Sequence, residues 1–253
     1  MAPRLRGYAV SDFEEQWQRR FERFATRHQA EHQVSGWSLA GLRQRVATFE
    51  SLLDRGLLPA GARVLELGCG AGTYVRLLGK RGHAVVGLDY SLPSLARAAA
   101  ADPGRLGRYV AGSSYALPFP SGSFDAVTCV GVLQVLTEPA AAIAEMGRVL
   151  SSRGALLVET LNAWNPIAVV RRLTAFGQGH PTHLRYGTAR IVERAMVAHG
   201  VRPLERIGVI VPPKSLPGLA ESLGRPWLRR ALGLTPGVRA VAAHAFWIVG
   251  SKV

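Results

Sequence analysis

The chain has 253 residues, of which 48% are hydrophobic, and a net charge of +14, so it is long enough for one large domain with a substantial buried core. No apolar run is long enough to cross a bilayer as a helix, and the first ten residues, MAPRLRGYAV, lack the long apolar stretch of a secretory signal, so we expect a soluble, cytoplasmic protein. The two cysteines, Cys69 and Cys129, do not have the spacing of a zinc site or a redox pair.

Two amphipathic helices are predicted in the first sixty residues. Aromatic side chains recur at helical spacing in residues 11–29, where Ser11 and Glu14 have the S-x-x-E spacing of a capping box. A second helix is predicted over residues 38–55, with Gly56 as its C-terminal cap. We expect residues 1–60 to form a helical cap whose apolar stripes pack against the rest of the chain. A lid over a pocket would have the same stripes.

Strands and helices alternate from residue 62 onward. Apolar segments predict strands at residues 63–67, 84–88, 108–111, 124–130 and 155–160. Helices are predicted between them, at residues 73–80, 93–101 (with Ser91 as N-cap) and 139–150. Several of these strands are apolar throughout, which is typical of a parallel sheet covered by helices on both faces. Residues 61–161 are therefore predicted to form the core of an α/β fold.

The last third of the chain completes the sheet. A polar and aromatic stretch up to Gly187 is expected to be a loop, and a helix is predicted over residues 188–200, from the cap Thr188 to Gly200. Strands are predicted at residues 204–211 and 240–249, with a helical insertion, residues 212–239, between them. Together with the preceding strands, these features predict a single-domain, doubly wound, Rossmann-like α/β fold. Its sheet would have seven strands, mostly parallel, with an antiparallel last strand.

The sequence VLELGCGAG, residues 64–72, places glycines at alternate positions directly after the first strand. A dinucleotide fingerprint needs its third glycine where this chain has Thr73, and a P-loop needs a lysine that is missing. Glu66 stands two residues before the first glycine, where a carboxylate would repel a pyrophosphate. The loop therefore indicates a ligand with cationic character and no need for a phosphate.

The second strand ends in Asp89, nineteen residues after Gly70. An acid at this place accepts hydrogen bonds from both hydroxyls of a ribose. A ligand that combines a ribose with a cationic ammonium or sulfonium group fits both signals, and S-adenosylmethionine is such a ligand. The alternative for Asp89 is a charge at a helix N-terminus beside Ser91.

Several motifs follow one another along the chain in a fixed order. VLELGCGAG is followed by GLDYS, by ALPFPSGSFDAVTCVGVLQVL and by EMGRVLSSRGALLVET. This series resembles the class I S-adenosylmethionine-dependent methyltransferases, in particular the subgroup that includes the quinone-biosynthesis methyltransferases. The resemblance covers residues 38–161 and, more weakly, the last two strands. It implies that residues 61–161 are the cofactor-binding core and that the chain is a methyltransferase enzyme.

The resemblance also implies roles for single residues. The loop Gly68, Cys69, Gly70 and Gly72 would contact the methionine part of the cofactor, with Glu66 orienting the site. Further cofactor contacts fall on Asp89 for the ribose, Tyr90 beside the adenine, Ser113 and Ser114 at the adenine edge, and Val130 after the fourth strand. Relatives usually have an Asp at the position of Ser113, and a hydroxyl accepts a hydrogen bond less strongly. Gln134 stands where many relatives have His.

The acceptor would bind beyond the C-terminal ends of the strands, beside residues 161–187. His180 and His183 in this segment are the candidate catalytic bases, with a solvated or capping role as the alternative. Two histidines without a nearby carboxylate make a poor metal site, so no metal is expected. No Asn/Asp-Pro-Pro-aromatic motif follows the fourth strand, and Cys129 lies within an apolar strand, so a small, partly apolar acceptor methylated on oxygen or carbon is the first hypothesis.

The charge of the chain is unevenly distributed. Residues 171–253 carry thirteen basic and three acidic side chains, whereas residues 1–60 and 61–170 each carry nine and seven. The insertion places leucines and Trp227 among Arg225, Arg229 and Arg230. This pattern predicts an amphipathic segment that touches an anionic membrane surface, or one that packs on the sheet edge with its arginines facing water. Two alternatives to a small-molecule methyltransferase remain: an RNA methyltransferase that uses this basic face, and a non-catalytic binding protein on the same fold. A generally arginine-rich composition would also explain part of the charge.

Overall fold

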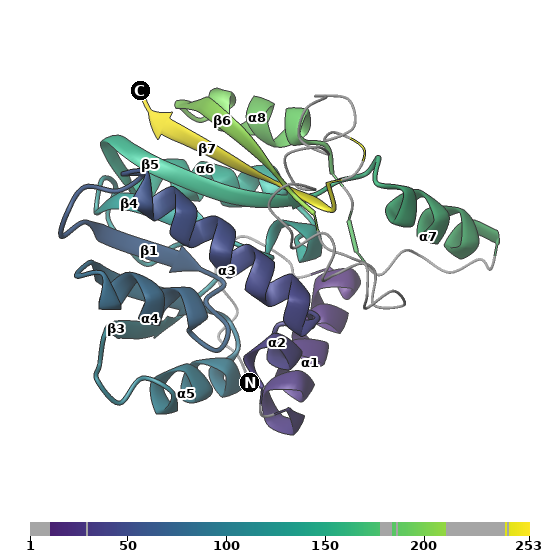
Figure 1. Ribbon diagram of the computed structural model, residues 1–253, viewed down its shortest axis with the longest axis horizontal. Helices are drawn as coiled ribbons and strands as arrows, with labels where there is room; N and C mark the ends of the chain where they lie inside the picture. Colours follow the sequence, from purple (N-terminus) through teal and green to yellow (C-terminus); the bar gives the residue numbers. More distant parts are fainter. Residues whose placement is uncertain (1–10, 29, 178–183, 186, 211–240, 242) are drawn as a thin grey trace.

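The computed structural model describes residues 11–28, 30–177, 184–185, 187–210, 241 and 243–253. Within these residues one sheet contains the strands β1 (Arg63–Leu67), β2 (Ala84–Asp89), β3 (Gly107–Ala111), β4 (Phe124–Cys129), β5 (Leu150–Leu161), β6 (Val201–Val209) and β7 (Ala245–Lys252). Their spatial order is β3-β2-β1-β4-β5-β7-β6, parallel from β3 to β5, with β7 antiparallel to both neighbours (Figure 1). The predicted fold class is confirmed. The strand order reverses between β1 and β4, which is where such sheets bind ligands.

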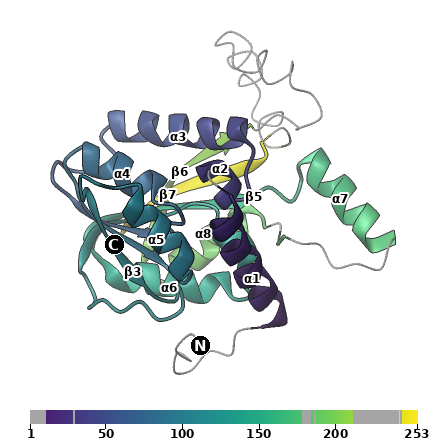
Figure 2. The ribbon, with the colours of Figure 1, turned by 90° about the horizontal axis from the view of Figure 1, so that it is seen from below.

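Helices cover both faces of this sheet. The described helices are α1 (Asp12–Arg27), α2 (Glu31–Val34), α3 (Leu39–Asp54), α4 (Thr73–Lys80), α5 (Leu92–Ala100), α6 (Pro139–Val149), α7 (Pro166–Gly177) and α8 (Ala189–Ala198), with a 3-10 turn η1 (Leu133–Val135). Side chains of α3 and α4 are buried against one face, and those of α6 and α8 against the other. Figures 1 and 2 show α1 and α2 at one end of the sheet and α7 projecting away from the body.

Aromatic rings join α3 and α4 to the sheet. Phe49, Tyr74 and Trp247 form a cluster in which neighbouring ring centroids lie 5.1–6.5 Å apart in edge-on geometry. Beside this cluster, Arg45 of α3 donates from Nε to Oε1 of Glu159 on β5 over 2.7 Å, with both side chains buried. The second helix predicted from sequence is therefore anchored to the sheet by apolar packing and by one buried ion pair.

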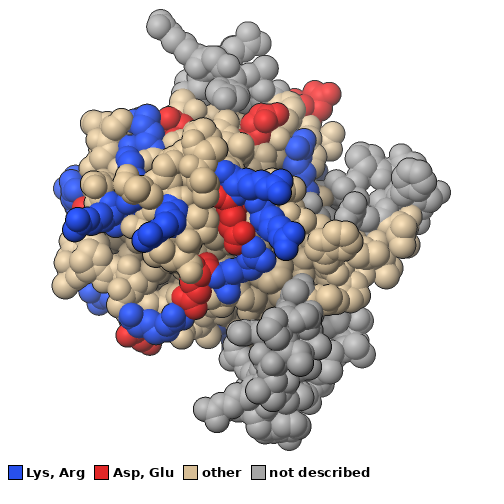
Figure 3. Space-filling model, turned by 90° about the horizontal axis from the view of Figure 1, so that it is seen from above, with Lys and Arg blue, Asp and Glu red and all other residues tan. Residues whose placement is uncertain are grey.

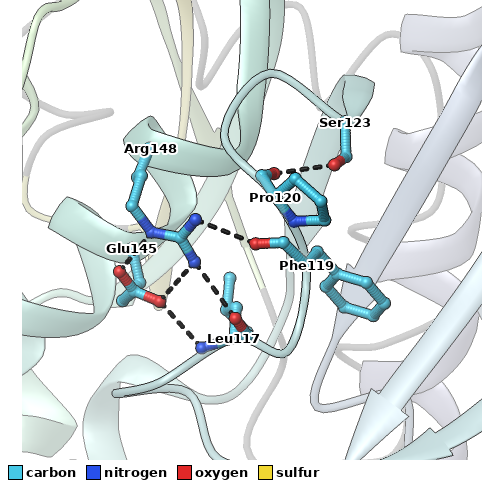
Figure 4. A network of polar contacts seen from close by, with 6 residues as sticks. All are labelled: Leu117, Phe119, Pro120, Ser123, Glu145 and Arg148. Atoms are coloured by element: carbon cyan, nitrogen blue, oxygen red, sulfur yellow. Dashed lines mark hydrogen bonds and ion pairs between the residues drawn. The ribbon is translucent and has the colours of Figure 1, made fainter.

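The loop that leads into β4 is held by α6 (Figure 4). Glu145 accepts a hydrogen bond from the backbone N–H of Leu117 over 2.7 Å, and Arg148 donates to the carbonyl oxygens of Leu117 and Phe119 over 3.0 and 2.8 Å. Glu145 and Arg148 also pair with each other over 2.6 Å. This network fixes the end of the segment that begins with Ser113 after β3.

Several predicted boundaries were wrong. Strand β5 begins at Leu150, where the helix was expected to end, rather than at residue 155. Helix α7 occupies much of the stretch expected to be a loop, β6 begins at Val201 rather than at residue 204, and β7 begins at Ala245 rather than at residue 240. The predicted insertion, residues 212–239, lies outside the described residues. In the part of the chain that the structure describes, no helix has the length and apolar character needed to cross a membrane.

Candidate functional site

The turn between β1 and α4 leaves room beside its backbone. Gly68 and Gly70 have φ values of +74° and +51°, a region that favours glycine, and Gly72 follows with +79°. A Cβ on Gly68 would lie 2.2 Å from Cγ2 of Val132, whereas a Cβ on Gly70 would meet no atom within 4 Å. Gly68 therefore lets the segment after β4 approach the turn, and Gly70 leaves space for a ligand against the backbone.

Asp89 joins this turn to the end of β2. Its Oδ2 accepts a hydrogen bond from the N–H of Gly70 and its Oδ1 one from the N–H of Ser91, each over 2.9 Å. The side chain is 7% exposed, and burial raises the pKa of its carboxyl although these backbone hydrogen bonds lower it. A carboxylate oxygen can accept more than one hydrogen bond. Asp89 is thus in direct contact with the glycine turn.

Glu66 lies beneath the same turn, on β1. Its Oε2 accepts a hydrogen bond from the hydroxyl of Thr128 on β4, and its Oε1 has no partner among the described residues. The side chain is 1% exposed, and burial raises the pKa of its carboxyl to about 8, while the hydrogen bond from Thr128 lowers it. Without a neighbouring cation, the carboxyl is therefore mainly protonated at pH 7. An arriving cation would stabilise the charged form.

The predicted adenine-edge residues lie in the turn after β3. Ser113 and Ser114 are half-buried, and the hydroxyl oxygen of Ser113 accepts a hydrogen bond from the N–H of Tyr115 over 3.1 Å. Tyr90 follows Asp89 and donates from its hydroxyl to the carbonyl oxygen of Gln18 on α1 over 3.4 Å. Burial raises the pKa of Tyr90. The structure brings these residues to the same sheet edge as Asp89.

The N-terminal cap is bonded to this edge through Glu14, which no sequence signal marked for the role. Its Oε1 accepts hydrogen bonds from the hydroxyl of Tyr115 and, over 2.7 Å, from the N–H of Thr137. Ser11 caps α1 as predicted by accepting from the N–H of Glu14 over 3.3 Å. Glu14 does not return that bond to Ser11, as a full capping box would, because its carboxylate is used between elements. The helix α1 is therefore attached to the loops after β3 and β4.

A second part of the cap borders the segment after β4. Val130 is buried, and Gly131 has a φ of +80°. A Cβ on Gly131 would lie 2.4 Å from Cζ2 of Trp37, so the indole packs directly against this glycine. Gln134 donates from Nε2 to the carbonyl oxygen of Gly131 over 2.7 Å, and its Oε1 has no partner in the part of the chain described. Val130, Gly131 and Gln134 therefore form one wall beside the glycine turn.

Neither cysteine has the surroundings of a nucleophile. Cys69 in the turn and Cys129 at the end of β4 are both buried, and burial raises the pKa of each thiol well above its usual value. Across the described residues, no cluster of three His, Cys, Asp or Glu side chains could hold a metal ion. Cys69 contributes to the site through its backbone position and not through its thiolate.

Part of the expected acceptor region is described. The candidate bases His180 and His183 lie outside the described residues. Asn162 donates from Nδ2 to the carbonyl oxygen of Ala243 over 2.8 Å and accepts from the N–H of Trp164, so it joins β5 to the chain before β7. Trp164 is 70% exposed. Arg185 donates to the carbonyl oxygen of Thr137 over 2.9 Å, which places the chain after α7 beside the site.

Comparisons with known proteins find similarity to methyltransferases. Residues 65–158 match a family model described as a methyltransferase domain. The chain is 37% identical over 109 residues to a ubiquinone biosynthesis O-methyltransferase of Xanthomonas axonopodis pv. citri, covering 42% of this chain and 46% of that protein. It is 37% identical over 110 residues to a demethylmenaquinone methyltransferase of Thermus thermophilus, covering 42% and 50%. The matches thus span about half the length of these relatives.

A solved structure from Thermotoga maritima, described as a possible histamine N-methyltransferase, is similar in fold. It has a TM-score of 0.63 and 17% sequence identity, and covers 92% of this chain and 98% of that one.

Proposed function

We propose that this chain, whose residues 65–158 belong to the class I S-adenosylmethionine-dependent methyltransferases, transfers a methyl group from S-adenosylmethionine to a small, partly apolar acceptor. The observation that carries the proposal is the contact of Asp89 with Gly70 beside Glu66, whose second oxygen is unpartnered among the described residues. One carboxylate would accept hydrogen bonds from hydroxyls and the other would face a cation, two ligand features that few cofactors combine.

The residues present fit the cofactor. S-adenosylmethionine carries a ribose, an ammonium and a sulfonium. The carboxylate of Asp89 would receive the two ribose hydroxyls, and Glu66 Oε1 would receive the ammonium. The open space at Gly70 would let the ligand approach the backbone. Ser113, Ser114 and Tyr90 would contact the adenine, and Val130 would border the methionine portion.

Methyl transfer requires little covalent chemistry from the protein itself. When bound, S-adenosylmethionine supplies an activated methyl group. The chain has to hold the acceptor in line and exclude water. Glu14 and Trp37 place the cap across the sheet edge, where it would shield the site. If the acceptor must lose a proton, His180 and His183 are the proposed bases.

We propose a small acceptor because relatives of this chain bear the names of quinone-biosynthesis enzymes. Quinone rings are planar and partly apolar, and both oxygen and carbon atoms are methylated in such compounds. Residues 212–239 are proposed to touch an anionic membrane surface, which would suit an acceptor dissolved in lipid. We also propose the division into a cap (1–60), a cofactor core (61–161) and an acceptor-side region (162–253).

Tritiated S-adenosylmethionine tests the reaction directly. The purified chain is incubated with total RNA and, separately, with an organic extract of the same cells. We expect label in the organic extract and none in RNA. The variant Asp89→Ala should lose transfer, whereas Asp54→Ala, which alters an exposed acid on α3, should retain it. Label confined to RNA would contradict the acceptor class, and no label in either fraction would favour a non-catalytic binding protein.

A further inference from the structure

The wall after β4 contains the side-chain amide of Gln134. Gln134 is 5% exposed, and its Nε2 is committed to the carbonyl oxygen of Gly131 over 2.7 Å. Its backbone carbonyl accepts from the N–H of Arg185 over 2.9 Å, so the residue is fixed from two sides. Its Oε1 has no hydrogen-bond partner among the described residues. Buried polar atoms are nearly always paired, so this acceptor is available to a ligand that carries a donor.

A flat aromatic surface borders the same glycine. Trp37 packs its ring edge against Gly131, and the guanidinium of Arg45 lies 4.5 Å from the centroid of the Trp37 ring. Arg45 is held in turn by its buried ion pair with Glu159. Trp37 itself is only partly buried. The indole therefore has a fixed orientation and retains accessible surface, as an aromatic platform for a ligand requires.

Both features lie at the methyl-donor side of the site. Glu66 and Thr128 are paired in register on β1 and β4, and Gly131 follows two residues after β4 ends. Val132 packs against Gly68 of the glycine turn. The segment 131–134 thus crosses the point where the strand order reverses, with Trp37 at one side of Gly131 and the amide of Gln134 on its carbonyl oxygen.

We propose that Trp37 and Gln134 select the methyl acceptor, and that the acceptor is a planar aromatic ring bearing a hydroxyl group. The ring would lie against Trp37, and the hydroxyl would donate a hydrogen bond to Gln134 Oε1. A neutral amide accepts that bond without removing the proton, so Gln134 is a binding residue and not a base. This inference rests on the proposed methyl transfer and narrows its substrate class.

The test uses two small aromatic acceptors, catechol and thiophenol, and compares the wild type with Gln134→Leu. Catechol donates strong hydrogen bonds, whereas thiophenol has a nucleophilic sulfur and only a weak S–H donor. With tritiated S-adenosylmethionine, we expect Gln134→Leu to raise the KM for catechol at least tenfold and to leave that for thiophenol nearly unchanged, because a site built to bind a hydroxyl discriminates through that bond. Trp37→Ala should raise the KM for both acceptors, and Trp37→Phe should restore much of the loss.

Matched controls are Gln33→Leu and Trp164→Ala, which make the same changes at exposed positions. Calorimetry with S-adenosylhomocysteine verifies that each variant is folded; if Gln134→Leu does not bind, Gln134→Met replaces it. Equal losses for catechol and thiophenol would overturn the role of Gln134. A wild-type chain that methylates extract material but no hydroxylated ring would overturn the inference and leave the proposed function standing. Failure of the wild type to bind S-adenosylhomocysteine would contradict both the inference and the proposed function.

Discussion

Glu66 is a buried acid whose charge depends on the groups beside it. Its carboxyl is buried with a pKa of about 8 in the folded chain, against 4.5 as the ordinary value. Between these two values the folded chain holds a proton that the unfolded chain releases. Stability therefore falls as pH rises from about 4.5 to about 8, because the unfolded state binds fewer protons over this range.

This linkage can be measured with Glu66→Gln, which keeps the shape of the neutral side chain. We expect the wild-type free energy of unfolding to decline relative to that of the variant by up to about 1.4 kcal/mol per pH unit between pH 5 and 8. Urea denaturation at pH 5, 6, 7 and 8 gives the comparison. Glu138→Gln makes the same change at an exposed position. A constant difference between wild type and Glu66→Gln across this range would show that Glu66 does not hold a proton in the fold.

At the scale of elements, the buried ion pair between α3 and β5 decides how firmly the cap is attached. Replacing Arg45 by Met removes the partner of the buried Glu159, and breaking a buried ion pair in this way typically costs about 3–5 kcal/mol. The double variant Arg45→Met with Glu159→Leu removes both charges and should recover much of this loss. Denaturant unfolding of the three chains measures it.

The exposed pair of Arg63 with Asp125 is the matched control, since it is also an Arg–carboxylate pair between elements. Arg63→Met should change stability little, because water screens both charges. If Arg45→Met were as mild as Arg63→Met, the buried pair would not anchor α3.

Elements inside the core were predictable from sequence because their pattern is local. The apolar run of β1 and its glycine turn, and the caps Ser91 and Thr188, depend on residues adjacent in the chain. The start of β6 was missed because Pro203 suggests a break. Proline is tolerated there because β6 is an edge strand, and the register shifts between Pro203 and Glu205.

The rest of the site depends on contacts between distant segments. Glu14 lies 101 residues from Tyr115 and 123 from Thr137, and Trp37 meets Gly131 across a similar distance. In the sequence these residues have the spacing of ordinary helix positions. Sequence patterns therefore predicted Asp89 and the glycine turn, whose partners follow a known spacing, but not the cap residues that the fold brings to them.

Across the whole molecule, the surplus of positive charge has no binding partner assigned to it. Figure 3 shows one face on which Lys and Arg side chains are widespread and acidic side chains lie among them. Several of the described acids are paired, as in Arg206–Glu193 and Arg55–Glu205. The strongest surplus of sequence charge lies in residues 171–253, and the segment proposed for membrane contact is outside the described residues.

Liposome co-sedimentation tests that proposal. We expect vesicles with anionic lipid to retain the chain at low salt and to release it at high salt, because each arginine near such a surface contributes about 1 kcal/mol and salt screens the attraction. Replacing Arg225, Arg229 and Arg230 by Gln should abolish retention while S-adenosylhomocysteine binding persists. Equal sedimentation with neutral vesicles, or no effect of the triple change, would contradict membrane contact through this segment.

Calorimetric titration of S-adenosylhomocysteine measures whether Asp89 and the glycine turn bind the ribose of the cofactor. The wild-type chain should bind, and Asp89→Ala should bind at least tenfold more weakly, since the lost contacts are hydrogen bonds to a charged group worth on the order of 2 kcal/mol. Asp125→Ala, at the opposite end of β4, should bind like the wild type. No binding by the wild type, or equal binding by Asp89→Ala, would show that Asp89 does not hold the ribose.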